Sequence, residues 1–275
     1  MRGRTKAARA PTERSEPDIP TDVDLHVETQ GKGRPALLIH SDATTGRSGW
    51  RKQIALSERW RLTFPDRPGY GASPSTRRVD FEHEAAVFEP LLESGSHLVG
   101  HSYGGIVALY LAAAAPQRIL SLTVIEPPAF GLTEAPEAAK LRAAFQELWA
   151  DGPREPFEFF RLFASLVGER PWPRPPLPPA MEAGVRALMG ERAVWEARPD
   201  LDALAQAPFP VLVVSGGHAP GFETVCDAIA SRTNAQRAVI RGAQHSVPRV
   251  GQPFNDLLEQ FWLDSEKTTH KTEKR

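Results

Sequence analysis

The sequence has little cysteine, almost no net charge and no long apolar segment. Its 275 residues contain one cysteine, Cys226, which excludes an internal disulfide and a cysteine-based zinc site and favours a reducing cytoplasm as the compartment. Lys and Arg number 33 against 34 Asp and Glu, a net charge of −1, which argues against nucleic acid or an anionic membrane as a partner. The longest apolar run, residues 106–115, is about half of the ~20 residues that a membrane-spanning helix needs.

Both ends of the chain are polar and poor in large apolar residues. Residues 1–20 carry several Arg and Lys, and no apolar stretch follows them as a secretory signal would require. We expect residues 1–20 to form a disordered arm and residues 264–275 a disordered tail. The overall composition, 41% hydrophobic and 24% charged, is typical of an ordinary globular protein.

Short apolar runs and helical segments alternate between these ends, which predicts an α/β fold with parallel strands and helices on both faces of the sheet. Strands are expected at residues 24–29, 36–40, 61–64, 97–100, 120–125, 211–214 and 237–240, and helices at 49–58, 80–92, 102–115, 222–231 and 254–263. Residues 127–207 break this pattern and hold nine of the 22 aromatic residues. We expect them to form an inserted, mainly helical cap on a core made of residues 21–126 and 208–263.

Residues 31–36 match the glycine pattern G-x-G-x-x-A of dinucleotide sites. A strand follows instead of a helix, and Pro35 lies inside the pattern, so the structural context that such a site needs is missing. We therefore do not interpret this segment as a dinucleotide site, and the chemistry described below needs no cofactor.

The clearest chemical signal is the segment Gly100-His101-Ser102-Tyr103-Gly104-Gly105 between an apolar strand and an apolar helix. It fits the pattern G-x-S-x-G, a turn so tight that residues two before and two after the serine come together and must lack side chains. The turn directs the Ser102 hydroxyl into a crevice. Because the helix begins there, its first amides point at the same crevice and favour negative charge, which makes the amide of Tyr103 a candidate oxyanion donor.

Four segments, taken in order, resemble the α/β-hydrolase superfamily in its serine branch, of the AB hydrolase-1 type. They are LLIHSD at 37–42, PDRPGYGAS at 65–73, GHSYGG at 100–105 and GAQHSVP at 242–248. The resemblance covers about residues 24–263. It implies an eight-stranded, mostly parallel sheet, a pocket under a cap, and a triad in the chain order serine, acid, histidine.

A serine hydroxyl needs a neighbouring base to act as a nucleophile, and imidazole, with an ordinary pKa of ~6.5, suits that task. Of the eight histidines, His245 stands where the family keeps its base, between a late strand and the last helix. His40 and His101 are expected to be structural. No H-E-x-x-H or comparable ligand spacing occurs among the eight histidines, so a catalytic metal is not expected.

The acid departs from the commonest pattern of the family. After the strand at 211–214 the family usually has G-x-x-D, but Ala219 stands in the place of the aspartate. In some branches the acid follows the previous strand, and Glu126 occupies that position, so the resemblance favours Glu126. Glu223 and Asp227, close after Ala219, remain alternatives. The triad acid holds the histidine in the required tautomer and stabilises its cation.

The second oxyanion donor is expected from the loop after residues 37–39. The family usually has His-Gly there, whereas this chain has His40-Ser41-Asp42. The backbone amide of Asp42 is our candidate for this donor.

These residues predict a serine hydrolase that cleaves an ester, thioester or lactone of a small, fairly apolar substrate through an acyl-enzyme on Ser102. Among these activities, a carboxylic ester hydrolase or a lactonase is the favoured prediction. A C–C bond hydrolase, an acyltransferase or a perhydrolase would use the same residues, and a non-catalytic ligand-binding protein of this fold is the alternative from another class. The expected partner is the small-molecule substrate, and the sequence leaves a homodimer open.

Overall fold

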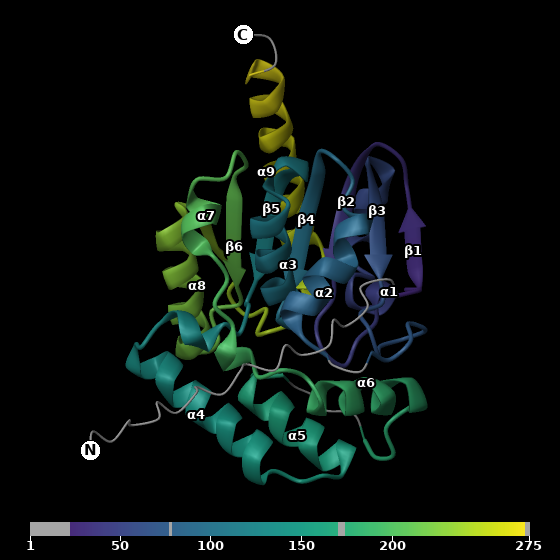
Figure 1. Cartoon of the computed structure of the whole chain (residues 1–275), viewed down its shortest axis with the longest axis vertical. Coiled ribbons are helices and arrows are strands. Elements are labelled where there is room, and N and C mark those ends of the chain that lie inside the picture. The colour runs from purple at the N-terminus through teal and green to yellow at the C-terminus, as the bar shows by residue number, and fades with distance from the viewer. Residues whose placement is uncertain (1–22, 77–78, 170–173, 273–275) are drawn as a thin grey trace, which may run out of the picture.

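A twisted sheet of seven strands forms the centre of the molecule (Figure 1). The computed structural model describes residues 23–76, 79–169 and 174–272. The strand order is β1-β3-β2-β4-β5-β6-β7. β1 is antiparallel to β3 and all the other neighbouring pairs are parallel. The strands are β1 (Val27–Gln30), β2 (Arg34–Ile39), β3 (Trp60–Pro65), β4 (Ser96–His101), β5 (Ile119–Ile125), β6 (Val211–Ser215) and β7 (Gln236–Val239).

The mostly parallel sheet is confirmed, but the expected number of eight strands is wrong for the described residues. The seven strands correspond to the seven apolar runs of the sequence, and the eighth was implied by the family resemblance alone. After β1 the chain turns at once into β2 through Gly31 and Gly33, both at positive φ. The edge strands β1 and β7 are four residues long each, and no further strand pairs with either in the described part of the chain.

Alternate side chains of the central strands enter two separate cores. Leu37 and Ile39 of β2 face a core shared with α2 (Phe81–Phe88), α3 (Tyr103–Ala114), α7 (Leu201–Ala205) and α8 (Pro220–Thr233). Ala36 and Leu38 face a second core with α9 (Gln252–Thr272) and the 3-10 turn Gln53–Glu58. Helices therefore cover both faces, as the alternation of strands and helices predicts. No helix in the described ranges is both long and apolar enough to cross a membrane.

Two predicted helices differ from the structure. The helix expected at 49–58 is instead the short α1 (Gly46–Gly49) followed by a 3-10 turn. Thr45 and Ser48 form a capping box at the start of α1, and Trp50 ends it by entering the core. α2 begins after Asp80, whose side chain caps it by accepting from the amides of Glu82 and His83. It stops at Phe88, four residues earlier than expected, where a 3-10 turn containing Pro90 follows.

The disordered tail expected at 264–275 is wrong for residues 264–272, because α9 continues to Thr272. Glu266 anchors the first part of this added length. Its carboxylate accepts from the Trp60 indole at 2.9 Å and lies 3.3 Å from His97 Nε2, which fixes this part of α9 on β3 and β4. The arm expected at residues 1–20 and the last three residues lie outside the described residues.

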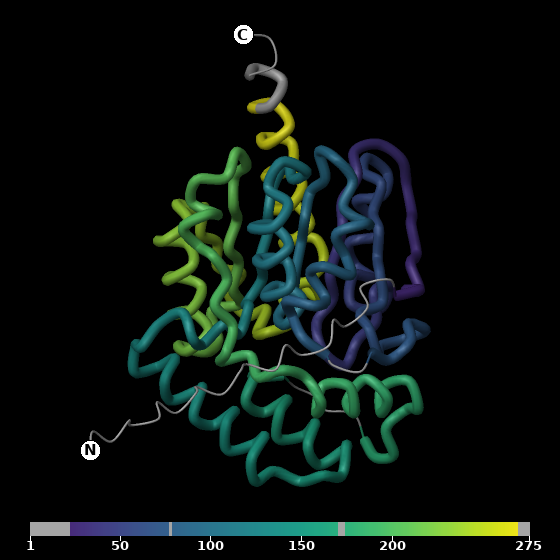
Figure 2. Tube along the Cα trace, viewed as in Figure 1, coloured from purple at the N-terminus to yellow at the C-terminus, as the bar shows by residue number. Residues whose placement is uncertain are grey.

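The segment at 127–207 folds into helices, most of which lie across the carboxyl ends of the strands. α4 (Pro136–Asp151), α5 (Pro156–Leu166) and α6 (Pro179–Met189) form a layer beyond one end of the sheet (Figures 1 and 2). α7, by contrast, packs beside the sheet against α3 and α8. The crevice between the sheet and α5 and α6 is where the predicted functional residues gather.

Candidate active site

Ser102 occupies a strained turn between β4 and α3. Its φ of 56° and ψ of −123° are sparsely populated for a residue with a side chain and cost of order 1–3 kcal/mol. The glycines around Ser102 leave no room for a side chain. A Cβ atom on Gly100 would collide with the carbonyl of Gly104, and a Cβ atom on Gly104 would lie 2.5 Å from the carbonyls of Ile39 and His40. The steric reason inferred from G-x-S-x-G is confirmed, and the turn exposes Ser102 to a cavity.

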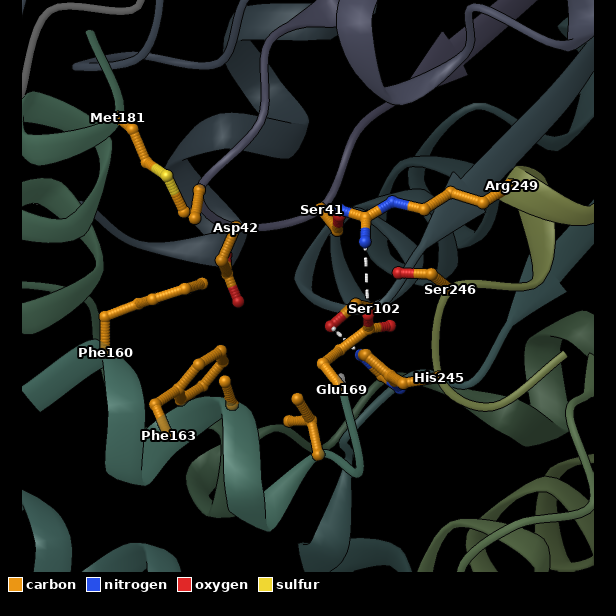
Figure 3. A pocket seen from close by; sticks show the side chains of 13 residues that line it. Ser41, Asp42, Ser102, Phe160, Phe163, Glu169, Met181, His245, Ser246 and Arg249 are labelled. Atoms are coloured by element: carbon orange, nitrogen blue, oxygen red, sulfur yellow. Dashed lines mark hydrogen bonds and ion pairs between the residues drawn. The ribbon is translucent and has the colours of Figure 1, made fainter. Parts of the chain in front are cut away.

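His245 lies in the loop after β7 and faces Ser102. Its Nε2 is 2.9 Å from Ser102 Oγ (Figure 3). The loop is held from below, because His101 Nε2 lies 2.9 Å from the backbone carbonyl of His245 and donates to it. Burial, together with the charge of His245, lowers the pKa of His101 to about 3, so His101 is a neutral donor that supports the loop.

Glu126 completes a chain of hydrogen bonds from the end of β5. Its Oε2 accepts from His245 Nδ1 at 2.7 Å and its Oε1 accepts from the amide of Gly216 at 2.6 Å. Its backbone has a φ of 44°, a second strained residue at this site. Burial opposes ionisation of Glu126, but hydrogen bonds from His218 and His245 outweigh it and lower its pKa to about 2.

The alternative acids point elsewhere. Glu223 accepts from Ser215 Oγ at 2.8 Å and from the Gly217 amide at 3.0 Å, and it forms an ion pair with Arg237 at 2.6 Å. Asp227 pairs with the same Arg237 at 2.8 Å. The structure therefore brings Glu126, and neither alternative, to His245.

His218 is a residue at this site that the sequence reasoning missed. Its Nε2 is 2.9 Å from the backbone carbonyl of Val167, just past the end of α5, and its Nδ1 is 3.3 Å from Glu126 Oε1. Both neighbours are acceptors, so both contacts are favourable only when His218 carries two protons. Burial opposes this charge, but Glu126 outweighs it and raises the pKa of His218. The available signal was a histidine beside Ala219 in the loop where the usual acid is missing.

Glu126, His218 and His245 offer ligand atoms within 4.8 Å of one another, as no other trio in the described ranges does. Both oxygens of Glu126 already accept hydrogen bonds, from His245 and from the Gly216 amide. We interpret the cluster as the hydrogen-bonded pair of His245 and Glu126, with His218 as a neighbouring imidazole within ion-pair distance of the same carboxylate.

The two candidate oxyanion donors flank Ser102. Tyr103 begins α3 and Asp42 follows β2, and within the described chain neither backbone amide donates to a backbone carbonyl. The Asp42 carboxylate would oppose a developing negative charge, but its Oδ1 forms an ion pair with Arg67 Nη1 at 2.8 Å. Both amides are thus free to donate at the nucleophile, and the nearby negative charge is compensated.

Arg67, from the loop after β3, is the centre of a second buried cluster. Besides Asp42 it pairs with Glu84 at 2.7 Å and with Glu191 at 2.6 Å. The Arg67 amide donates to His40 Nε2 at 2.8 Å. Burial and the charge of Arg67 lower the pKa of His40 to about 3, which keeps it a neutral acceptor that ties β2 to this loop.

A cavity of about 170 Å³ opens beside Ser102 and His245. Its wall on the side of α5 and α6 is apolar, with Phe160, Phe163 and Met181, and its other wall carries Arg249 and Glu169, which form an ion pair at 3.1 Å (Figure 3). A cavity of this size suits a small ligand with an apolar part.

Comparison with known proteins decides the family. The model of the Alpha/beta hydrolase family matches residues 36–258. The chain belongs to this family and is an enzyme. The α/β hydrolase fold also agrees with the order of strands and with the turn at Ser102.

Individual relatives of this α/β hydrolase have different described activities. A pimeloyl-[acyl-carrier protein] methyl ester esterase of Aeromonas hydrophila is 29% identical over 264 residues, covering 87% of this chain and 99% of the relative. A thermophilic esterase from Thermogutta terrifontis, 23% identical, superposes with a TM-score of 0.61 over 87% of this chain and 94% of that one. The structure of an N-acyl homoserine lactonase, 20% identical in sequence, superposes with a TM-score of 0.67 over 90% of this chain and 95% of that one. These two structures support the fold.

Proposed function

We propose that the protein is a serine esterase that forms an acyl-enzyme on Ser102. The observation that carries this proposal is the continuous chain of short contacts from Glu126 Oε2 to His245 and from His245 Nε2 to Ser102 Oγ, at 2.7 and 2.9 Å, beside a cavity. Contacts of this length are those of a nucleophile with its base and of a base with its orienting acid. The similarity to a methyl ester esterase supports ester hydrolysis.

In the proposed reaction, Ser102 Oγ attacks the carbonyl carbon while its proton passes to His245 Nε2. The amides of Tyr103 and Asp42 bind the oxyanion, each such donor being worth roughly 3 to 4 kcal/mol. His245 then donates the proton to the leaving alcohol. In the second half, water takes the place of the alcohol and attacks the acyl carbon while its proton passes to His245. The bond between the acyl carbon and Ser102 Oγ then breaks, His245 returns the proton to Oγ, and the acid is released. Glu126 stabilises the imidazolium that forms in both halves.

The size and lining of the cavity support a small substrate. Its volume is about 170 Å³, and its apolar wall is supplied by α5 and α6, so we propose that α4–α6, within the insertion 127–207, serve as a cap that selects the substrate. A lactone is the second candidate, since ring opening needs the same attack and an N-acyl homoserine lactonase shares the fold. Neither reaction calls for a cofactor.

A fluorophosphonate probe tests the proposal directly, because it labels a serine only when a base activates it. We expect one adduct, located on Ser102 by peptide mass spectrometry, and no adduct in Ser102→Ala. Ser121, buried in β5, provides the matched control variant, Ser121→Ala, which should label as the wild type does. Folded wild-type protein that hydrolyses no 4-nitrophenyl acetate and takes no probe would refute the proposal.

A further inference from the structure

His218 is packed between the inserted segment and the core. It comes from the loop after β6, and its side chain is 12% exposed. The ring of Phe222, in the first turn of α8, lies against the imidazole with the ring centroids 5.8 Å apart. Gly168, just past α5, leaves room for the imidazole, because a Cβ atom there would lie 2.5 Å from His218 Cδ2. The core and the inserted segment therefore both contact this ring.

One nitrogen of the imidazole binds the end of α5, the helix whose side chains line the cavity. His218 Nε2 lies 2.9 Å from the carbonyl oxygen of Val167, the residue that caps α5. The last carbonyls of a helix have no partner within the helix and need a donor from outside it. Phe160 and Phe163 of α5, and Val167 itself, line the cavity beside Ser102. Through this contact His218 fixes the end of the helix that forms the apolar wall.

The other nitrogen faces the proposed triad acid. His218 Nδ1 lies 3.3 Å from Glu126 Oε1, within ion-pair distance. The Gly216 amide, from the same loop, donates to this oxygen at 2.6 Å, while Oε2 accepts from His245 Nδ1 at 2.7 Å. The loop that carries Ala219 in the usual place of the acid thus contacts Glu126 with both an amide and an imidazole.

We propose that His218 is a positioning residue that fixes the Glu126 carboxylate and the α5 wall of the cavity relative to each other. His218 is not part of the cavity lining in the described chain, so it acts on the triad through Glu126 and on the substrate through Val167. This inference rests on the proposed esterase function. Loss of the contact with Glu126 should lower kcat, because the acid then orients His245 less well. Loss of the contact with Val167 should raise KM for substrates that pack against α5.

Two amide variants separate the two contacts. In His218→Asn the side-chain nitrogen is as many bonds from Cα as Nδ1 of the histidine, so it can donate to Glu126 but is too short to reach Val167. In His218→Gln the nitrogen is as many bonds from Cα as Nε2, so it can donate to Val167 and leaves Glu126 without this neighbour. His218→Leu removes both contacts. The assay is kcat and KM for 4-nitrophenyl acetate and 4-nitrophenyl butanoate, with thermal unfolding as the check of folding.

We expect His218→Gln to lower kcat about 10-fold for both esters, the effect of about one hydrogen bond, and to keep KM within about two-fold of the wild type. His218→Asn should keep most of kcat and raise KM about 3- to 10-fold for the butanoate, which has more apolar surface to place against α5 than the acetate. His218→Leu should show both losses.

His26→Leu is the matched control. His26 Nδ1 likewise lies close to a buried carboxylate, at 3.0 Å from Asp66 Oδ2. Within the described ranges, however, His26 neither lines the cavity nor bonds to a residue of the proposed triad. In this variant kcat and KM should both stay within about two-fold of the wild type.

A folded His218→Leu with wild-type kcat and KM would overturn the positioning role. The same pattern of losses in His218→Asn and His218→Gln would overturn it too, because His218 would then only stabilise the fold. This comparison decides the question even where His218→Leu does not fold. Failure of the esterase function itself looks different, because hydrolysis would then be absent from the wild type or would persist in Ser102→Ala.

Discussion

Replacing Glu126 by glutamine tests the proposed triad at its most unusual member. The Gly216 amide fixes the orientation of the new amide group, because its N–H lies 2.6 Å from the Oε1 position and needs an acceptor there. The carbonyl oxygen of the glutamine will therefore occupy that position. Its NH₂ group must then face His245 Nδ1, which is 2.7 Å from the Oε2 position.

The consequence is the wrong tautomer of His245. With an N–H donor opposite Nδ1, that nitrogen becomes an acceptor, and the ring proton moves to Nε2, which points at Ser102 Oγ from 2.9 Å. A protonated Nε2 cannot take the serine proton. A comparable change in a serine protease lowers kcat about 10⁴-fold, which corresponds to ~5.4 kcal/mol in the activation barrier at 1.36 kcal/mol per decade. We expect a loss of this order in Glu126→Gln.

The assay is kcat for 4-nitrophenyl acetate at pH 7.5, with thermal unfolding as the check that the variant is folded. Glu223→Gln is the matched control, because Glu223 is a partly buried acid in the first turn of α8 that contacts Arg237 and not His245. It should keep kcat within about three-fold of the wild type. A folded Glu126→Gln within ten-fold of wild-type kcat, or a 10⁴-fold loss in Glu223→Gln instead, would refute the assignment.

Three further expectations concern stability and reactivity. The raised pKa of His218 means that its contacts stabilise the fold fully below its ordinary value of 6.5 and lose this contribution as pH rises through the raised value. The Tm difference between wild type and His218→Asn should accordingly be largest near pH 6 and shrink toward pH 9; a constant difference would contradict the charge on His218. In Gly104→Ala the new Cβ would lie 2.5 Å from two backbone carbonyls, so the free energy of unfolding should fall by about 1–3 kcal/mol and Tm by several degrees. Gly190→Ala, whose Cβ would have its nearest neighbour at 3.5 Å, is the control and should not show this loss. Burial raises the pKa of the Cys226 thiol well above its ordinary value, so native protein should react with a disulfide reagent only as fast as it unfolds, and rapid native labelling would disprove this.

The turn at Ser102 could be predicted from sequence because its determinants are local. Glycines two before and two after the serine, a strand ahead and a helix behind define the geometry without reference to the rest of the chain. Predicting Glu126 as the triad acid needed one further step, because Glu126 becomes a candidate only once Ala219 is found at the usual position of the acid. The parallel sheet followed from the alternation of apolar runs, each of which became a strand.

Features that depend on distant contacts could not be predicted in this way. α9 continues into a polar segment, where the carboxylate of Glu266 contacts the side chains of Trp60 and His97 on the sheet. His218 gains its role from the carbonyl of Val167, a residue of the inserted segment. Glu191 meets Arg67 across 124 positions. None of these pairings leaves a periodic or spaced pattern, so only the folded chain reveals them.

Ser102 lies between two buried charged clusters that handle protons in opposite ways. On the His245 side, one carboxylate faces two imidazoles, and the lowered pKa of Glu126 keeps its negative charge where the proposed reaction forms an imidazolium. On the Asp42 side, three carboxylates share one guanidinium, and burial raises the pKa values of Glu84 and Glu191, which opposes their ionisation. Negative charge is thereby favoured where a cation develops and disfavoured where the oxyanion develops. The proposed acyl transfer forms an imidazolium on one side of Ser102 and an oxyanion on the other. This difference between the two clusters stabilises both charges.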